Sequence, residues 1–224
     1  MNTKIGDWVV YKNNQLIAFN KPATIPIQED KTGDKSLLLL AGIYCKSKVH
    51  LIHRIDRPAS GLVLFAKTPN ALRFMNAQFQ NRQVKKFYWA VVQNRPAEDS
   101  GKLIHFLKKK SSQNRSYAYD EEVAGSKKAE MKYRLLGSSD KYHLLEVELI
   151  SGRHHQIRAQ LAAIDCPIKG DVKYGFRRGN RDRSIHLHAR KMVFEHPTSG
   201  EEVELVSEPN LEDAIWSYFV EKGL

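Results

Sequence analysis

The sequence predicts a single α+β domain built on one mixed, mainly antiparallel sheet with flanking helices. Segments with strand character outnumber those with helical spacing, and several neighbouring strands are separated only by short polar turns. Such turns are typical of antiparallel neighbours, because parallel neighbours need a long crossover. No repeat or long linker interrupts the 224 residues, a length that can bury one full core. We therefore expect one domain over residues 1–224.

In the first half of the chain, the elements are predicted by their end signals. A polar turn at 12–14 separates the first two strands, and Ser36 is placed to cap a short buried helix that begins the run 37–40. Thr68 and Pro69 mark the start of a second helix, whose residues 72, 75 and 79 form an apolar face. The strands expected here lie at 8–11, 15–19, 62–66 and 87–92.

The second half opens with its least regular part, residues 94–130, which are rich in Lys, Ser, Asn and Asp. Only short strand fragments are expected there, at 103–107 and 116–119. A helix is predicted over 153–164, and Asn210 is the expected cap of a last helix that buries Leu211, Ile215 and Phe219. The remaining expected strands lie at 145–150, 185–194 and 203–206.

The composition indicates a cytoplasmic protein with a polyanionic partner. Thirty-six basic residues against 25 acidic ones give a formal charge of +11, which favours nucleic acid or an anionic membrane surface. No apolar run is long enough for a membrane span, and the N-terminus lacks the features of a secretion signal. The two cysteines, Cys45 and Cys166, are far apart and are read as small hydrophobic residues in a reducing compartment.

The first candidate for chemistry is Asp56, which lies between Arg54 and Arg57 just before a Ser-Gly turn and an apolar strand. Adjacent positive charge favours the ionised carboxylate. An ionised aspartate with no second acid nearby is suited to nucleophilic attack. The alternative, left open by these residues alone, is an inert surface Arg-Asp pair.

The second candidate is the segment 151–158, which is expected to open a helix after an alternating strand. A helix start binds phosphate or carboxylate through its free N–H groups, and Arg153 and Arg158 add positive charge. Four-residue spacing predicts that His154 and Arg158 share one helix face. The alternative is a solvated basic face.

The strand 85–90 interleaves lysines with aromatic residues, a pattern that suits RNA bases and phosphates. Alternation predicts Phe87 and Trp89 in the core and Tyr88 exposed as the functional side chain, with Lys86 beside it. Basic residues that would follow RNA phosphates, or form a mobile solvated loop, occur at 173, 177, 178, 181, 183, 190 and 191. The histidine pairs 50/53 and 186/188 lack companion ligands, so no metal site is predicted.

These motifs together resemble the RluA-type pseudouridine synthases. The segment 53–62 resembles the family's catalytic motif, 86–90 its Lys-x-Tyr-x-Ala strand, and 152–158 with 167–174 its third motif. Residues 20–22 resemble its first motif, and 187–189 with 196–197 its late motif, all in the family's order. Ala59, Thr24 and His154 depart from the usual residues, which concerns substrate fit. The family's separate RNA-binding extension is not expected in this chain.

The resemblance implies an enzyme that isomerises uridine in ribosomal or transfer RNA without a cofactor, after flipping the base into a pocket. It implies that Asp56 is essential, either adding to the sugar C1′ or abstracting the 2′ proton. Arg158 would pair with Asp56, and Tyr88 would stack on the base. The RNA-binding residues implied or expected are Arg54, which enters the space left by the flipped nucleotide, Lys86, Arg153, His154 and Leu187.

Two other classes stay open. One is a non-catalytic RNA-binding or ribosome-assembly protein on the same scaffold. The other is a metal-dependent nuclease, which is disfavoured because the motifs supply no clustered carboxylates. No strongly apolar exposed stripe is evident, so the sequence predicts a monomer that binds RNA and no membrane.

Overall fold

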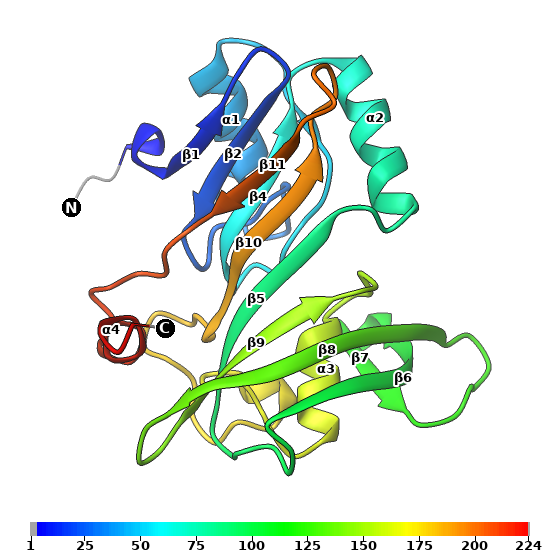
Figure 1. Cartoon of the computed structure of the whole chain (residues 1–224), viewed down its shortest axis with the longest axis vertical. Coiled ribbons are helices and arrows are strands. Elements are labelled where there is room, and N and C mark those ends of the chain that lie inside the picture. The colour runs from blue at the N-terminus through cyan, green and yellow to red at the C-terminus, as the bar shows by residue number, and fades with distance from the viewer. Residues whose placement is uncertain (1–3, 224) are drawn as a thin grey trace. The chain divides into compact units, whose positions relative to one another are not determined.

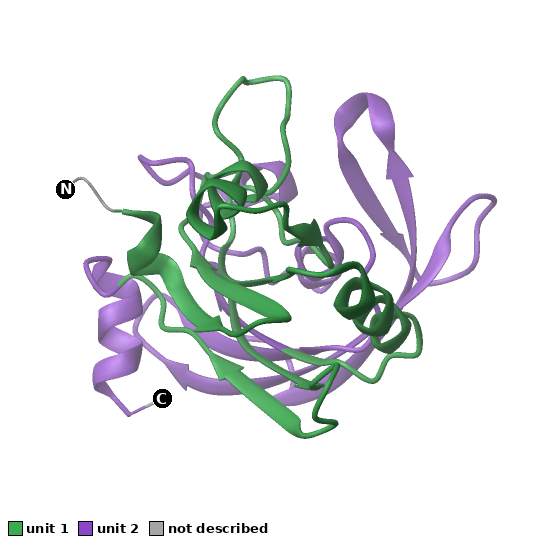
Figure 2. Cartoon of the chain, turned by 90° about the horizontal axis from the view of Figure 1, so that it is seen from above, with its two compact units in different colours: residues 1–86, 188–210 green, residues 87–187, 211–224 purple. Residues whose placement is uncertain are grey.

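The computed structural model describes residues 4–223 as two compact units, each assembled from segments distant in the sequence (Figures 1 and 2). Unit 1 combines the chain up to Lys86 with residues 188–210, and unit 2 combines residues 87–187 with the chain from Leu211 onward. The single domain expected over residues 1–224 stays a prediction. The α+β class with mainly antiparallel strands is confirmed within both units.

Unit 1 orders its strands β1-β2-β4-β10-β11, with the short β3 also paired to β4. All these pairs are antiparallel except β4 with β10, which run parallel at Ser60–His188 and Gly61–Ala189. The core clusters around Phe19, Phe65 and Leu37. The elements are η1 (Ile5–Trp8), β1 (Val9–Lys12), β2 (Leu16–Lys21), α1 (Leu37–Cys45), β3 (His50–Leu51), β4 (Ser60–Ala66), α2 (Pro69–Gln80), β10 (Leu187–Glu195) and β11 (Glu202–Val206).

The helices of unit 1 begin where their capping residues predict. The Ser36 hydroxyl accepts the Leu39 N–H at 3.2 Å, and the Thr68 hydroxyl accepts the Ala71 N–H at 3.2 Å. Pro69 occupies the first turn of α2, where its missing N–H costs nothing. The expected strand at 8–11 is shifted, because Trp8 ends the 3₁₀ helix η1 and β1 starts at Val9.

Unit 2 orders its strands β5-β9-β8-β6-β7, and every pair is antiparallel. Helix α4 packs Trp216 and Phe219 against Trp89 and Val91 of β5, and α3 contributes Ala159 to a second cluster. The elements are β5 (Lys85–Val92), β6 (Ser100–Lys110), η2 (Ser111–Gln113), β7 (Arg115–Tyr119), β8 (Lys127–Ser138), β9 (His143–Leu149), α3 (Gln156–Ala163), η3 (Val172–Tyr174) and α4 (Ala214–Glu221).

The structure corrects the expectation that residues 94–130 are irregular. This stretch contains the 11-residue strand β6, strand β7 and the start of β8. Its polar composition reflects strands with one exposed face: in β6, Leu107 is buried, whereas the lysines at 102 and 108–110 are exposed. Pairing with β7 and β8 fixes β6 as a strand, and such long-range pairing leaves only a weak local signal.

Two helix starts also differ from prediction. Helix α3 begins at Gln156, three residues later than expected, because His155 adopts a left-handed backbone with φ of 53°. Helix α4 begins after Asp213, whose carboxylate accepts the N–H groups of Ile215 and Trp216 at 2.9 and 3.2 Å. Leu211 therefore precedes the helix and is exposed, whereas Phe219 is buried as expected. No helix within residues 4–223 is long and apolar enough to cross a membrane.

Candidate functional site

Asp56 lies in the connection between β3 and β4, in a turn closed by a hydrogen bond from the Ala59 N–H to the Asp56 carbonyl at 3.1 Å. Ala59 is buried, which anchors the turn, and Ser60 then starts β4. Asp56 and Arg57 are half-buried, whereas Arg54 is exposed. The turn thus holds the Asp56 carboxylate on a fixed backbone, and the exposed side chain of Arg54 lies just before it in the sequence.

The Ser-Gly step after Asp56 is required by the parallel contact between β4 and β10. Gly61 has φ of +108°, and a Cβ at this position would lie 2.4 Å from the Ala189 carbonyl oxygen. The Ser60 hydroxyl lies 2.9 Å from His188 Nδ1, and His188 Nε2 lies 3.0 Å from the Ser207 carbonyl oxygen. Because a carbonyl only accepts, Nε2 carries the hydrogen and Nδ1 accepts from Ser60. Burial lowers the His188 pKa to about 4, so the ring stays neutral.

Lys21 is a charged neighbour of Asp56 that the sequence reasoning missed. It is fully buried at the end of β2, opposite Gly61 in the strand register. Its Nζ donates to the carbonyl oxygens of Pro22, Ile25 and Arg57 at 2.9, 3.0 and 3.1 Å, which uses all three ammonium hydrogens. Burial lowers the pKa of Lys21 to about 7, against the opposing effect of the nearby Asp56 carboxylate. A lysine two residues after the apolar run 16–19 was the available signal.

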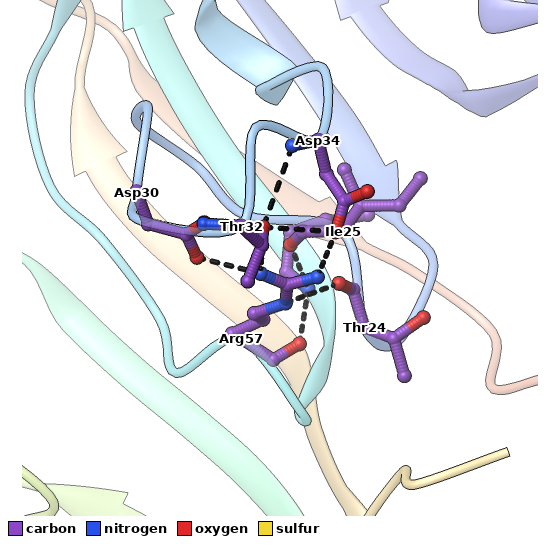
Figure 3. A network of polar contacts seen from close by, with 7 residues as sticks. Thr24, Ile25, Asp30, Thr32, Asp34 and Arg57 are labelled. Carbon is purple, nitrogen blue, oxygen red and sulfur yellow. Dashed lines mark hydrogen bonds and ion pairs between the residues drawn. The ribbon is translucent and has the colours of Figure 1, made fainter.

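Arg57 is turned toward the loop of residues 28–35, as Figure 3 shows. Its Nε donates to the Thr24 carbonyl oxygen at 2.8 Å, and its Nη1 donates to Asp30 and Thr32 at 2.6 and 2.7 Å. Its Nη2 donates to Asp34. Hydrogen bonds from the side chain and backbone of Thr32, and then from Arg57, hold the pKa of Asp30 at about 2. Hydrogen bonds from Arg57, and then from Thr32, hold the pKa of Asp34 below its usual range. Of the two arginines beside Asp56, this one is engaged within the protein.

In unit 2, Arg158 lies on α3 and is only 4% exposed. Its Nε and Nη2 donate to the two carboxylate oxygens of Asp171 at 2.6 and 2.8 Å, and its guanidinium carbon lies 4.9 Å from the centre of the Tyr174 ring. Asp171 is a partner that sequence reasoning did not assign. The geometry fixes the guanidinium plane, because a bidentate pair restricts its orientation.

The predicted shared helix face of His154 and Arg158 is wrong, because His154 precedes α3. Its ring nitrogens lie 2.9 Å from the Ser116 hydroxyl and 3.1 Å from the Asn114 side-chain oxygen. The ring also stacks on His155, with centroids 3.8 Å apart. At the start of α3, the Arg153 N–H donates to the Gln156 side chain at 3.0 Å, so this N–H is already used within the protein. Arg153 itself is exposed.

The aromatic strand β5 differs from prediction at one position. Trp89 is buried as expected and Phe87 is half-buried, but Tyr88 is also buried, at 7% exposure. Both faces of β5 are covered from Tyr88 onward, so alternation does not expose this residue. Lys86 is half-buried with its Nζ 5.5 Å from the centre of the Phe79 ring, and burial lowers its pKa.

The predicted catalytic residues fall in both units: Asp56 in unit 1, and Tyr88 and Arg158 in unit 2. The pairing of Asp56 with Arg158 therefore stays a prediction. Leu187 is buried at the start of β10. Three of the four histidines considered for metal have other partners: His188 as described above, His186, which bonds Asn180 and Asp213 at 3.1 Å, and His53, whose Nε2 accepts the Leu64 N–H at 3.0 Å.

Comparison with known proteins places this combination of turn, strand and helix in one class. The model of the RNA pseudouridylate synthase family matches residues 15–163, more than half of the chain. The chain therefore belongs to the RNA pseudouridylate synthase family. The predicted resemblance is confirmed, and the matched range includes Asp56, Tyr88 and Arg158.

Individual relatives agree with this assignment. The chain is 31% identical to an uncharacterized RNA pseudouridine synthase of Mycoplasma genitalium, over 85% of this chain and 62% of that protein. It is 30% identical to ribosomal large subunit pseudouridine synthase C of Vibrio parahaemolyticus, over 88% and 64%, and 31% identical to tRNA pseudouridine synthase C of Haemophilus ducreyi, over 88% of each. The chain thus spans somewhat less than two thirds of the first two relatives.

Solved structures share the fold. Human RNA pseudouridylate synthase domain containing 4 superposes with a TM-score of 0.78 at 22% identity, covering 97% of this chain and 94% of that one. Human RNA pseudouridylate synthase domain containing 1 superposes with a TM-score of 0.76 at 23% identity, covering 94% and 86%. The expected pseudouridine synthase fold is confirmed.

Proposed function

We propose that this protein is an RNA pseudouridine synthase that converts uridine to pseudouridine in ribosomal or transfer RNA. The observation that carries the proposal is the family match, which includes the Asp56 turn, the Tyr88 strand and the Arg158 helix in order. The named activities of the relatives from Vibrio parahaemolyticus and Haemophilus ducreyi support both RNA classes as substrates. The formal charge of +11 suits the RNA backbone.

Asp56 is the proposed reactive group. The reaction breaks the bond between the uracil nitrogen and the sugar C1′, and the freed base rejoins the same carbon through its own carbon. Asp56 supports either route, by adding to C1′ or by taking the 2′ proton. The turn gives the Asp56 carboxylate a defined position, and the nearby Lys21 side chain interacts with it electrostatically.

The other proposed roles are supported by the hydrogen bonds, burial or exposure of each side chain. Arg158, held flat by Asp171, is the proposed partner of the Asp56 carboxylate. Tyr88 is the proposed stacking residue for the base, and its burial in β5 gives it a rigid support. Arg54 and Arg153, both exposed, are proposed to contact RNA together with Lys86, His154 and Leu187.

We further propose that the protein acts in the cytoplasm as a monomer that binds RNA. We propose no cofactor, because uridine and pseudouridine are isomers and their interconversion needs no oxidant, reductant or group donor. Exposed basic residues between 173 and 183 support contact with the RNA backbone, through an electrostatic attraction to phosphates that weakens as the salt concentration rises. The single catalytic domain over residues 1–224 belongs to this proposal.

The test compares the wild-type protein with Asp56→Ala and Asp56→Asn on total cellular RNA that lacks this modification. We expect the wild type to form pseudouridine at defined positions and both variants to form none, with RNA binding nearly unchanged. Asp140→Ala, at an exposed acid distant in sequence, is the matched control and should keep full activity. Pseudouridine formation by Asp56→Ala would overturn the assignment, and a wild type that binds RNA without forming product would favour the non-catalytic alternative.

A further inference from the structure

All three guanidinium nitrogens of Arg57 are engaged, Nε by Thr24 and both Nη atoms by the 28–35 loop. Nε, Nη1 and Nη2 each donate to a different residue, namely Thr24, Asp30 and Asp34, and Nη1 also reaches Thr32 (Figure 3). The Thr32 hydroxyl donates to Asp30 in turn, at 2.5 Å. Two carboxylates therefore face one guanidinium, and the loop is closed on Arg57 through charge-assisted bonds.

The backbone of Arg57 is also held by hydrogen bonds. Its carbonyl oxygen accepts from the Thr24 N–H at 2.8 Å and from Lys21 Nζ at 3.1 Å. Thr24 is thus bonded to Arg57 twice, through its N–H and through its carbonyl oxygen. These bonds hold the peptide between Arg57 and Pro58, and because Arg57 follows Asp56 directly, they restrict the backbone next to the residue that carries the carboxylate.

The backbone of Thr24 is strained in this arrangement. Its φ is +71°, a left-handed conformation that a β-branched residue rarely adopts. Such a conformation persists only where the surroundings enforce it, and the two bonds to Arg57 are the ones that act directly on the Thr24 peptide groups. Release of the Arg57 side chain would remove one of these bonds and let Thr24 relax.

We propose that Arg57 is a positioning residue for Asp56, and that the 28–35 loop is the clamp that holds Arg57 in place. This inference rests on the proposed function, since it assigns Asp56 as the reactive group. Asp30 and Asp34 occupy the guanidinium donors that an RNA phosphate would use. Their combined negative charge also exceeds the single positive charge of Arg57, so the clamp as built disfavours a phosphate at this position.

The test measures kcat and KM for pseudouridine formation in Arg57→Lys, Arg57→Met and the double variant Asp30→Asn with Asp34→Asn. We expect kcat to fall about tenfold to a hundredfold in Arg57→Met, because misplacement of a reacting group by about 1 Å costs up to that factor. Arg57→Lys keeps the charge, but its single nitrogen cannot reach the separate partners of Nε, Nη1 and Nη2, so it should lose nearly as much. KM should stay within about twofold throughout. Lys31→Met, in the same loop, is the control and should match the wild type.

The double variant separates the clamp from an RNA contact by the sign of its effect. Under the clamp, removing both loop carboxylate charges lowers kcat. If Arg57 bound RNA instead, the same change would free its guanidinium and lower KM, while Arg57→Met would raise KM. That second pattern would overturn the proposal.

Two further readouts test the inference, and the first of them does not depend on the assigned activity. Trypsin should cleave the loop after Lys31 or Lys35 faster in Arg57→Met than in the wild type, and unchanged cleavage would contradict the clamp whether or not the protein forms pseudouridine. Thr24→Gly removes the strain at φ of +71°. Added to Arg57→Met, it should restore part of kcat, whereas a further loss would show that Thr24 does not connect Arg57 to Asp56.

Discussion

Replacing Asp171 with asparagine should lower the free energy of unfolding by about 3 kcal/mol. The side chains of Arg158 and Asp171 are 5% and 1% exposed, and they share two charge-assisted hydrogen bonds of 2.6 and 2.8 Å. Asparagine keeps one acceptor oxygen but loses the carboxylate charge and places an NH₂ group against a guanidinium donor. One charge-assisted bond is worth about 1.5–3 kcal/mol, and breaking a buried pair costs about 3–5 kcal/mol.

Urea denaturation followed by tryptophan fluorescence measures this loss, because Trp89 and Trp216 both lie in the core of unit 2. Glu146→Gln is the matched control, since it removes the charge from the Arg134–Glu146 pair, whose side chains are 65% and 26% exposed. That change should cost less than about 1 kcal/mol. A loss below about 1 kcal/mol for Asp171→Asn would refute the view that this pair holds Arg158 in place.

Two further predictions concern unit 1. Gly61→Ala should lower the free energy of unfolding by about 3–5 kcal/mol, because the new Cβ would meet the Ala189 backbone and the φ of Gly61 is positive. Gly42→Ala in α1 should instead raise the free energy of unfolding by at most about 1 kcal/mol. Thermal melts that rank the two variants alike would contradict the close-approach argument. Burial lowers the pKa of His188 to about 4 and of His53 to about 3. Below pH 6.5 the unfolded chain therefore binds more protons than the folded chain, and the free energy of unfolding decreases as the pH is lowered. Urea midpoints should show a loss of about 1 kcal/mol per histidine between pH 7 and 5.5, and an equal midpoint at both values would show that neither ring is held neutral.

Local signals predicted the parts of the fold that depend on a few consecutive residues. Ser36 and Thr68 cap their helices as expected, because a side-chain hydroxyl and an N–H three residues later suffice for a cap. The cap of α4 was misplaced, since Asn210 and Asp213 are both suitable residues. Asp213 also lies 3.1 Å from His186, a contact across 27 positions that the sequence does not display.

The candidate site was predicted where the motif is continuous and missed where it is assembled from distant segments. Asp56 follows from its motif, but the neighbourhood of Lys21 depends on the register of β2 with β4. The pairing of Asp171 with Arg158 depends on the loop after α3. Tyr88 was expected to be exposed because alternation assumes one open face, and β5 is covered on both faces.

The parallel pairing of β4 with β10 has a consequence for how the protein is made. The hydrogen bond between the Ser60 and His188 side chains can form only after His188, 128 residues later, has been synthesised. At a synthesis rate of about 5–20 residues per second, that interval lasts roughly 6 to 25 seconds. During this time the nascent chain holds the start of β4, a few residues after Asp56, without its β10 partner. The edge of β4 that pairs with β10 therefore stays unpaired in the growing chain until β10 emerges from the ribosome, and an unpaired strand edge is exposed to aggregation.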